Sequence, residues 1–353
     1  MKRFELWMRQ VLVGRVLRSC VPLVFALAWL WRRLLWRTTF IAVTGSLGKT
    51  TTTRLLAGIL STRGRTFHTV GNQNGGVLMP LNILRVRPWH RYAVIELGID
   101  RPGAMLHPAM TVRPDVAVIL DVAEVHTTGF DDLEQYTAEK AKLLDALAPG
   151  GLAVLNGDDP RVAGMAGRRH HRICLFGRSP EFDVWVEQGC SRWPERLRLL
   201  AHAGSRSFPI QTRLLGEHWM GPISAALAVT TRLGVDLEEA ARAIERVQPY
   251  TARMDPIELP NGAVIVRDDY NGTVATSEAS LKFLREVRAG RRLLIVTDIS
   301  DSGTNRNSRL RWLAQAVSGW LDLLVIVGKS QAYGVRKAIE QGMRPDHVQG
   351  FDD

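Results

Sequence analysis

A run rich in glycine and threonine, TGSLGKTTTT over residues 44–53, constrains this chain more than any other feature. Mostly apolar segments flank it, with residues 40–43 before it and residues 55–60 after it. A buried strand, a glycine loop and a helix in this order predict a phosphate cradle. Glycine lets backbone N–H groups approach phosphate, and the helix N-terminus adds partial positive charge. We expect Lys49 to reach the terminal phosphates and the Thr50 hydroxyl to bind Mg²⁺.

The loop does not meet the strict Walker spacing, because Val43 stands where that motif has its first glycine. It has the shorter form T-G-x-x-G-K-T-T instead. A plain Gly/Thr-rich turn before a helix is disfavoured, since strand, glycines, Lys and Thr occur in the order that a phosphate site requires.

The positive charge of the chain is concentrated at its N-terminus. The whole sequence has a formal net charge of +11. Residues 1–40 hold eight basic residues and one acidic residue, a net +7, which leaves +4 for the other 313 residues. The basic character therefore describes a terminal segment rather than a nucleic-acid-binding face, and we expect no nucleic-acid partner.

The N-terminal segment, residues 1–37, is also rich in tryptophan. It holds four of the ten Trp, and its apolar core over residues 21–31 is too short to cross a bilayer. Arginines at both ends with interleaved Trp favour a helix that lies in the headgroup region of an anionic leaflet. A signal peptide is disfavoured, because Arg32 and Arg33 follow the apolar core in place of small residues. The remaining alternative is an amphipathic helix packed on the protein's own domain.

Cysteine usage indicates the compartment. Cys20, Cys174 and Cys190 lie far apart in sequence and have no metal-binding spacing. A reducing cytoplasm without disulfides is the expected setting. With the basic segment, this predicts a cytoplasmic protein that is peripheral to the inner face of the cell membrane.

Beyond this segment, predicted strands alternate with predicted helices. Apolar runs at residues 92–97, 116–120 and 152–155 predict buried strands, and helical patterns cover residues 132–147 and 223–233. This alternation predicts an α/β fold with a doubly wound, mostly parallel sheet. Ligands of such sheets bind beyond the carboxyl ends of the strands.

Three units are expected along the chain. Residues 1–37 form an N-terminal basic and apolar helix, residues 38–252 form the ATP-binding domain, and residues 253–353 form a smaller Rossmann-like α/β domain. Strands at residues 263–266, 292–296 and 323–327 define the last unit.

Polar residues at or just after the predicted strand ends are the first candidates for chemistry. Glu96, Asp121 and His126 all fall at such places. Beside a phosphate loop, Glu96 and His126 are expected to share one Mg²⁺, which prefers hard and mostly oxygen ligands. Either residue alone would more often be structural.

Lys140 stands out in the predicted helix over residues 132–147. Counted at 100° per residue, it lies in the middle of an apolar stripe, while Lys142 points to the opposite face. An inward lysine is costly unless it is paired or chemically changed. The alternative is a lysine that keeps its amine in water. The stripe is formed by Leu133, Tyr136, Leu143, Leu144 and Leu147.

Arg253 stands at the expected junction between the two domains. An arginine there is suited to clamp a phosphate through two hydrogen bonds. A surface role is the equal alternative.

These motifs together resemble the Mur ligase family, ATP-dependent amide-bond ligases of cell-wall assembly. The resemblance runs from about residue 39 to the end of the chain. It is strongest to the branch that adds D-alanyl-D-alanine to UDP-MurNAc-tripeptide, the MurF branch. The motifs that carry it are Thr44-Gly45-x-x-Gly48-Lys49-Thr50-Thr51, Gly71-Asn72-x-Asn74 with Pro80-Leu81, Glu96-Leu97-Gly98 with Arg101-Pro102-Gly103, His126, Lys140, Asn156-x-Asp158-Asp159, Gly216-x-His218, Arg253-Met254 and Asp268-x-Tyr270-Asn271.

The resemblance implies a role for each matched residue. Glu96 and His126 would hold a second Mg²⁺ beside the ion at Thr50. Lys140 matches the family's carbamylated lysine, whose added CO₂ turns a cation into a metal-binding carboxylate. Its spacing from His126 and its helix face favour Lys140 over Lys142. Lys49, Glu96, His126 and Lys140 are the implied catalytic residues. Nucleotide contacts are implied for Thr44, Gly45, Ser46, Leu47, Gly48, Lys49, Thr50, Thr51, Asn72, His218, Arg253, Asp268, Tyr270 and Asn271.

Three departures from the family pattern stand out. Trp219 and Pro222 occupy positions where the family usually has Asn, and Thr273-Val274 replaces an Asn-Pro pair. Fewer than 40 basic, Trp-rich residues stand where the family has a UDP-sugar-binding domain. The chain is also expected to stop one helix and one strand short of the family's C-terminal domain.

The activity implied is an ATP-dependent ligation that proceeds through an acyl phosphate, in cell-wall or cell-surface polymer synthesis. The expected acceptor is a small-molecule, lipid-linked or polymeric carboxylate, and the expected amine is an amino acid or a dipeptide. Two narrower interpretations stay open, the D-alanyl-D-alanine-adding reaction itself and a polyglutamate- or capsule-type ligation. A non-catalytic nucleotide-binding module that recruits enzymes to the membrane is the alternative from a different class.

Overall fold

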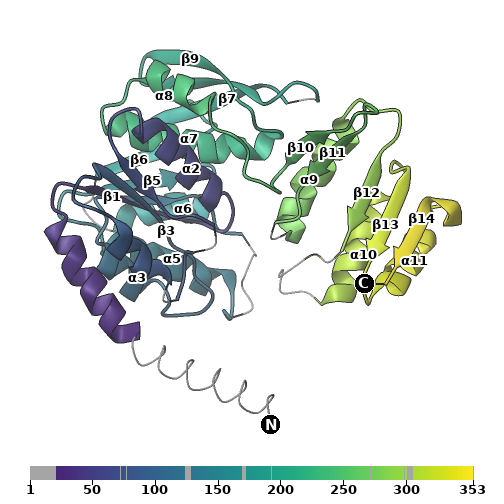
Figure 1. Cartoon of the computed structure of the whole chain (residues 1–353), viewed down its shortest axis with the longest axis horizontal. Helices are drawn as coiled ribbons and strands as arrows, with labels where there is room; N and C mark the ends of the chain where they lie inside the picture. The colour runs from purple at the N-terminus through teal and green to yellow at the C-terminus, as the bar shows by residue number, and fades with distance from the viewer. Residues whose placement is uncertain are drawn as a thin grey trace, which may run out of the picture.

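The computed structural model describes residues 21–71, 73–76, 78–123, 129–168, 172–191, 193–270, 272–297, 299 and 305–352. Residues 1–20 of the N-terminal segment lie outside these ranges, as do the predicted site residues Asn72, His126 and Asn271. The described chain forms a large domain on one central sheet and a smaller C-terminal domain with a sheet of its own (Figure 1).

The central sheet is mostly parallel, as predicted. Its described strands are β1 (Thr39–Thr44), β2 (Thr66–His68), β3 (Tyr92–Glu96), β4 (Val116–Ile119), β5 (Leu152–Asn156), β6 (Arg172–Gly177), β7 (Val184–Cys190), β8 (Arg198–Ala203) and β9 (Arg206–Gln211). They lie in the order β2-β3-β1-β4-β5-β6-β7-β8-β9. Every pairing from β2 to β7 is parallel, and β7, β8 and β9 pair antiparallel.

Helices cover both faces of this sheet, because successive strand residues point to opposite faces. On β1, Ile41 and Val43 contribute to one apolar core, and Phe40 and Ala42 contribute to the other. The first core includes side chains of α2, α7 and α8, and the second includes side chains of α3, α4 and α5. The helices of this domain are α2 (Lys49–Leu60), α3 (Leu78–Arg85), α4 (Leu106–Val112), α5 (Leu133–Asp145), α6 (Pro160–Ala163), α7 (Met220–Arg232) and α8 (Leu237–Ile244), with 3₁₀ turns η1 (Gly164–Arg168) and η2 (Glu217–Trp219).

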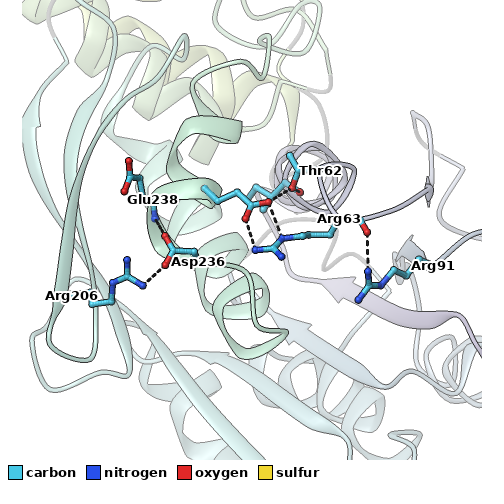
Figure 2. A network of polar contacts seen from close by, with 8 residues as sticks. Thr62, Arg63, Arg91, Arg206, Asp236 and Glu238 are labelled. Carbon is cyan, nitrogen blue, oxygen red and sulfur yellow. Dashed lines mark hydrogen bonds and ion pairs between the residues drawn. The ribbon is translucent and has the colours of Figure 1, made fainter.

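Polar contacts tie the chain just after α2 to α8 (Figure 2). Arg63 donates from Nε to Glu239 Oε1 at 2.8 Å, and Arg91 donates to the Arg63 carbonyl at 2.9 Å. Asp236, the N-cap of α8, pairs with Arg206 of β9. These contacts anchor the far end of the helix whose first residue follows the glycine loop.

The C-terminal domain has a hairpin, a three-stranded parallel sheet and an apolar core of its own. Leu281, Leu310 and Leu324 are among the buried residues of that core. Thr273 caps α9 by accepting a hydrogen bond from the Thr276 N–H at 3.2 Å. The elements are β10 (Asp255–Glu258), β11 (Val264–Arg267), α9 (Val274–Glu286), β12 (Leu293–Val296), α10 (Arg306–Val317), β13 (Leu323–Val327), α11 (Gln331–Glu340), η3 (Pro345–His347) and β14 (Val348–Phe351).

Residues 21–34 form a helix that precedes β1 and packs one face on the large domain. Phe25 and Ala28 are buried there. Arg32 donates to the Asp115 carboxylate at 3.2 Å, and the same carboxylate oxygen accepts the Phe40 N–H at 2.8 Å. The helix is thereby linked to the start of β1. Within the described residues, no helix has the length and apolarity needed to cross a bilayer.

Sequence patterns located seven of the fourteen strands in the described residues, and they missed β2, β10 and β14 as well as one whole region. The strands expected at residues 92–97, 116–120 and 152–155 are β3, β4 and β5. Strands β6 to β9, over residues 172–211, were not predicted. β6 continues the parallel sheet, and β7, β8 and β9 extend it by an antiparallel ribbon.

Candidate functional site

The candidate site lies where the strand order of the central sheet reverses. β1 is flanked by β3 on one side and β4 on the other. The helix that follows β1, α2, packs on one face of the sheet, and α4 and α5, which follow β3 and β4, pack on the other. Such a switch point opens a crevice at the carboxyl ends of the strands. Thr44, Glu96 and Asp121 all lie at or just beyond these ends.

The glycine loop over residues 45–48 fits tightly against the chain that follows β4. A Cβ added to Gly45 would lie 2.8 Å from Leu120 Cβ, so only glycine fits. Gly48 has a left-handed φ of 75° and precedes α2, and among the described residues no side-chain cap bond is made at this helix start. The first N–H groups of α2 are therefore free to bind an anion, as the sequence predicts.

Pro222, one of the departures from the family pattern, packs against this loop. A Cβ on Gly48 would lie 2.9 Å from Pro222 Cγ. The proline thus supports the loop from α7, although an amide side chain was expected there.

Asp121 holds the glycine loop in shape through its carboxylate. One oxygen, Oδ1, accepts the N–H groups of Ser46 at 2.7 Å and Leu47 at 2.9 Å. Burial raises the pKa of Asp121, and the nearby ammonium groups of Lys140 and Lys49 oppose that shift. The sequence placed Asp121 at a strand end without assigning it a role.

Lys49 is folded back onto its own loop. Its Nζ donates to the carbonyls of Gly45 at 2.8 Å and Ser46 at 2.9 Å. Burial lowers the pKa of Lys49, and the carboxylates of Glu96 and Asp121 oppose that shift. Its ammonium thus stands between the loop and the two carboxylates.

The neighbouring loop threonines are buried. Thr44 donates to the Leu97 carbonyl at 2.9 Å, while Thr50 and Thr51 lie in the first turn of α2. Thr50 directly follows Lys49, in the first helical turn after the glycine loop.

Glu96 offers a buried oxygen suited to a cation. Its side chain is 1% exposed, and Asn74 Nδ2 donates to Oε1 at 2.8 Å. The other oxygen, Oε2, has no hydrogen-bond partner among the described residues. A buried carboxylate oxygen without a donor fits Mg²⁺, which takes hard oxygen ligands. The described residues hold no group of three His, Cys, Asp or Glu that would complete a site by themselves.

Lys140 is buried on α5, so the helix face predicted for it is confirmed. It is 1% exposed, and its Nζ lies 4.2 Å from the ring centroid of Tyr136. Burial lowers the pKa of Lys140 well below its usual value, and Lys49 adds to that shift. The alternative of an amine kept in water is therefore wrong.

Lys142 differs from its expected environment. Its side chain is only part-exposed, and Nζ donates to Glu139 Oε2 at 2.6 Å. Glu139 is itself buried and accepts the Met105 N–H through its other oxygen at 2.8 Å. Lys142 therefore neutralises a buried carboxylate that joins α5 to the start of α4.

A cleft of about 240 Å³ joins this sheet edge to the C-terminal domain. His218 and Trp219 form part of its wall, and burial lowers the pKa of His218 to about 4. The imidazole is therefore neutral at pH 7. The lining also includes Leu47, Gly48, Asp121, Asn156, Arg253, Asp268 and Tyr270.

Arg253 is held in an unusual backbone turn at the domain junction. Ala252 and Met254 on either side have left-handed φ values of 62° and 48°. The guanidinium lies 5.0 Å from the ring centroid of Tyr270. Its Nε is buried without a hydrogen-bond partner among the described residues. The turn thus carries a cation, with an unused donor, to the cleft wall.

Asp268 braces this turn from the C-terminal domain. Its Oδ1 accepts the Met254 N–H at 3.1 Å, and its Oδ2 bonds to the Ser280 hydroxyl of α9. Burial raises the pKa of Asp268. One ion pair also joins the domains beside the cleft, because Lys282 of α9 donates to Glu217 of η2 at 2.8 Å.

Two family descriptions match the chain. Residues 43–230 match the Mur ligase middle domain, and residues 252–353 match the Mur ligase glutamate ligase domain. UDP-N-acetylmuramoyl-tripeptide–D-alanyl-D-alanine ligase of Escherichia coli (strain K12) is 27% identical over 303 residues, which cover 84% of this chain and 66% of the relative. The enzyme of that name from Mycobacterium bovis is 29% identical over 247 residues, 70% of this chain and 48% of the relative.

Solved structures agree with these matches. The crystal structure I of MurF from Acinetobacter baumannii has a TM-score of 0.83 at 26% identity and covers 93% of this chain and 70% of that one. MurF ligase from Thermotoga maritima in complex with ADP has a TM-score of 0.78 at 23% identity, covering 94% and 80%, and shares the fold. The chain spans less than two thirds of the length of the two curated relatives named above.

Proposed function

This chain belongs to the Mur ligase family, and on that premise we propose that it is an ATP-dependent, ADP-forming ligase that joins a carboxylate to an amine. The reaction would serve cell-wall or cell-surface polymer synthesis. The observation that carries the proposal is one juxtaposition at the switch point. The glycine loop, the Lys49 ammonium and the partnerless Glu96 oxygen meet at the same sheet edge, beside the cleft that reaches Arg253.

The proposed chemistry transfers the terminal phosphoryl group of ATP to an oxygen of the substrate carboxylate, giving an acyl phosphate and ADP. An amine then attacks the carbonyl carbon, and the tetrahedral species releases phosphate to leave the amide. Lys49 would leave its loop carbonyls and donate to the transferring phosphate, whose developing charge it stabilises. Arg253 would use its free Nε on the nucleotide from the C-terminal side.

We propose that Thr50 holds one Mg²⁺ and that Glu96, with His126 as its implied partner, holds a second. The ions would supply charge neutralisation and orientation of phosphate oxygens. Asn74 fixes the Glu96 carboxylate by donating to its other oxygen. Asp121 holds the N–H groups of the glycine loop in place through hydrogen bonds, and it contributes negative charge near Lys49 and Lys140.

Lys140 is proposed to be carbamylated in the active protein. Its depressed pKa favours the neutral amine, which adds to CO₂ by forming an N–C bond and losing a proton. Burial against Tyr136 supports this, because an unpaired ammonium is costly there. The product would be a carboxylate at a place where the chain otherwise has a buried amine.

The acceptor is proposed to be a small-molecule, lipid-linked or polymeric carboxylate, and the amine an amino acid or dipeptide. The printed names of the relatives favour a UDP-N-acetylmuramoyl-tripeptide and D-alanyl-D-alanine as the first pair to test. We also propose that residues 1–37 keep the protein in the cytoplasm at the inner face of the cell membrane, since their net charge is basic and their Trp content is high.

A turnover assay tests the function. ADP and phosphate release are measured with ATP, Mg²⁺ and pairs of acceptor and amine, starting with the pair named above and continuing with polymeric carboxylates and glutamate. Release that requires both partners, with a mass shift equal to an amide bond, supports the ligase. Nucleotide binding without turnover for every pair would instead support the non-catalytic module.

A further inference from the structure

The helix over residues 21–34 has a second apolar stripe that faces away from the domain. Leu23, Leu27, Leu30 and Leu34 recur at spacings of four, three and four, so they share one side of the helix. Their exposed fractions lie between 49% and 61%. Trp36, just after the helix, is 75% exposed. The opposite side of the same helix already packs on the large domain. The leucine stripe therefore packs against nothing within the described chain.

Two other exposed apolar groups flank this helix. On one side, Trp31 donates to the Val86 carbonyl at 2.9 Å and Thr38 to the His90 carbonyl at 2.7 Å, which fixes the loop that carries Trp89. Trp89 is 60% exposed.

On the other side of the helix lies α4. The ring of Phe25 lies 4.4 Å from that of His107, beside the exposed side chains of Leu106 and Met110. The helix stripe and its two flanks make up half of the large exposed apolar side chains of the described chain, and we call this set the apolar face. It consists of Leu23, Leu27, Trp29, Leu30, Leu34, Trp36, Trp89, Leu106 and Met110.

The charge around the apolar face is mostly basic. Residues 21–37, 86–91 and 105–113 hold six arginines and no Asp or Glu. One of the six, Arg32, is buried and paired with Asp115. Arg33 and Arg37 lie over the rings of Trp29 and Trp36, at 3.3 Å and 4.5 Å from the ring centroids. Paired Arg and Trp side chains at the rim of an apolar surface suit the headgroup layer of a bilayer, where the ring is half buried and the cation meets lipid phosphate.

We propose that the apolar face docks on an anionic lipid bilayer and that the loop over residues 86–90, through Trp89 and Arg87, is a second point of contact beside the helix. The inference deepens the peripheral location proposed above for residues 1–37 and does not depend on the ligase chemistry. A single helix would leave the protein free to roll about the helix axis. A helix and a lateral loop together fix which way the protein faces.

Binding of the full chain to vesicles tests this docking. Vesicles of phosphatidylcholine with phosphatidylglycerol are compared with phosphatidylcholine alone by flotation. Arg87→Gln is expected to lower the partition coefficient on anionic vesicles about fivefold, which corresponds to about 1 kcal/mol for one basic residue. Trp89→Ala is expected to lower it comparably. Leu27→Ser with Leu30→Ser removes two anchors and is expected to lower it tenfold or more.

Matched controls lie in the C-terminal domain, away from this face. Ile295→Ser removes an equally exposed aliphatic side chain, and Arg288→Gln removes an exposed arginine. Both are expected to bind like wild type. All sites changed are exposed, and the unfolding midpoint of each variant shows that the fold is intact.

Each outcome tests a different part of the proposal. Normal binding of both Arg87→Gln and Trp89→Ala, with weak binding of the leucine variant, would overturn the second contact and leave the helix as the anchor. Normal binding of all three would overturn the apolar face. No binding of wild type to anionic vesicles would overturn docking and the peripheral location together. None of these results bears on ADP release, which is measured separately with soluble substrates.

Discussion

The two walls of the cleft are built very differently. The wall from the central domain, which presents Asp121, rests on packed strands such as β3, in which all five residues are buried. Glu96 and Lys140, each 1% exposed, belong to the same packed domain without lining the cleft. The wall from the C-terminal domain presents Arg253, Asp268 and Tyr270 from loops, and its strand β12 exposes alternate residues. Side chains on packed strand ends keep one position whether or not a ligand is bound. Side chains on loops that follow a left-handed turn move with the domain that carries the loops.

This contrast suggests a division of labour. Groups that must hold charge in a fixed geometry lie in the rigid wall, where the low dielectric strengthens each interaction. The groups proposed to contact a bound nucleotide lie in the wall from the C-terminal domain, which we call the movable wall because its place depends on the position of that domain. Substitutions in the first wall should therefore act on the rate of chemistry, and those in the second wall on nucleotide affinity.

The largest effect is expected for Lys49→Ala. Its buried ammonium is the donor proposed to stabilise the transferring phosphate. Its loss should therefore lower the rate of ATP turnover about 10²- to 10³-fold, as for other preorganised donors. The melting temperature should stay within a few degrees of wild type. Turnover is measured at saturating ATP and Mg²⁺. A folded variant with near-normal turnover would show that the rigid wall does not perform the phosphoryl chemistry.

Lys140→Ala is expected to lower turnover about 10²-fold, because it removes the group proposed to become a metal-binding carboxylate. Added bicarbonate should not rescue it, whereas short carboxylic acids should restore part of the rate. A mass increase of one CO₂ on the wild-type peptide that contains Lys140, trapped by alkylation, checks the modification directly.

Lys142→Ala is the matched control on the same helix. It leaves buried Glu139 without its ion-pair partner, so a lower melting temperature is expected with turnover within about twofold of wild type. Equal loss of turnover in both variants would attribute the effect to α5 as a whole rather than to Lys140.

Arg253→Gln tests the movable wall. The variant keeps a hydrogen-bond donor but removes the charge, so the KM for ATP should rise about tenfold while kcat falls less than threefold, because a charge-assisted bond is worth about 1.5 kcal/mol. Steady-state kinetics at varied ATP give both constants. A fall in kcat as large as that of Lys49→Ala would remove the distinction between the walls.

The smallest effect is expected for Ala252→Gly. A left-handed residue other than glycine costs about 1 kcal/mol, so glycine relaxes the turn that places Arg253. The KM for ATP should rise less than fivefold, with a change of a few degrees in melting temperature by scanning calorimetry. If neither the KM nor the melting temperature changes, the left-handed conformation of Ala252 does not affect ATP binding or stability.

Much of the rigid wall could be predicted from the sequence. The phosphate loop has a local pattern, and the burial of Lys140 follows from helix geometry alone. Asp121 could be placed at a strand end, but its partners are backbone N–H groups 74 and 75 residues earlier, which no local pattern reveals. The pairing of Lys142 with Glu139 was missed. A lysine three residues after a glutamate on a helix can pair with it whether that glutamate is exposed or buried, so the spacing alone does not reveal the burial.

The movable wall was less predictable for a physical reason. Nothing in the types of Ala252 and Met254 indicates a left-handed turn, because neither residue prefers it. The contact of Asp268 with α9 depends on how two elements pack, and Ser280 has no pattern of its own. Loop-borne sites are set by tertiary packing, so sequence gives the residue types and not their arrangement.

The Asp115 carboxylate binds both Arg32 and the Phe40 N–H of β1, so it gives a fixed point from which a distance along β1 can be counted. β1 runs from Phe40, beside this carboxylate, to the glycine loop at Gly45, five residues away. At about 3.3 Å per residue, that is a reach of roughly 17 Å. With the helix seated on lipid, this reach is the largest separation that β1 can place between the Asp115 contact and the phosphate site. An acceptor carboxylate borne on a lipid would have to span the part of that distance that lies along the bilayer normal.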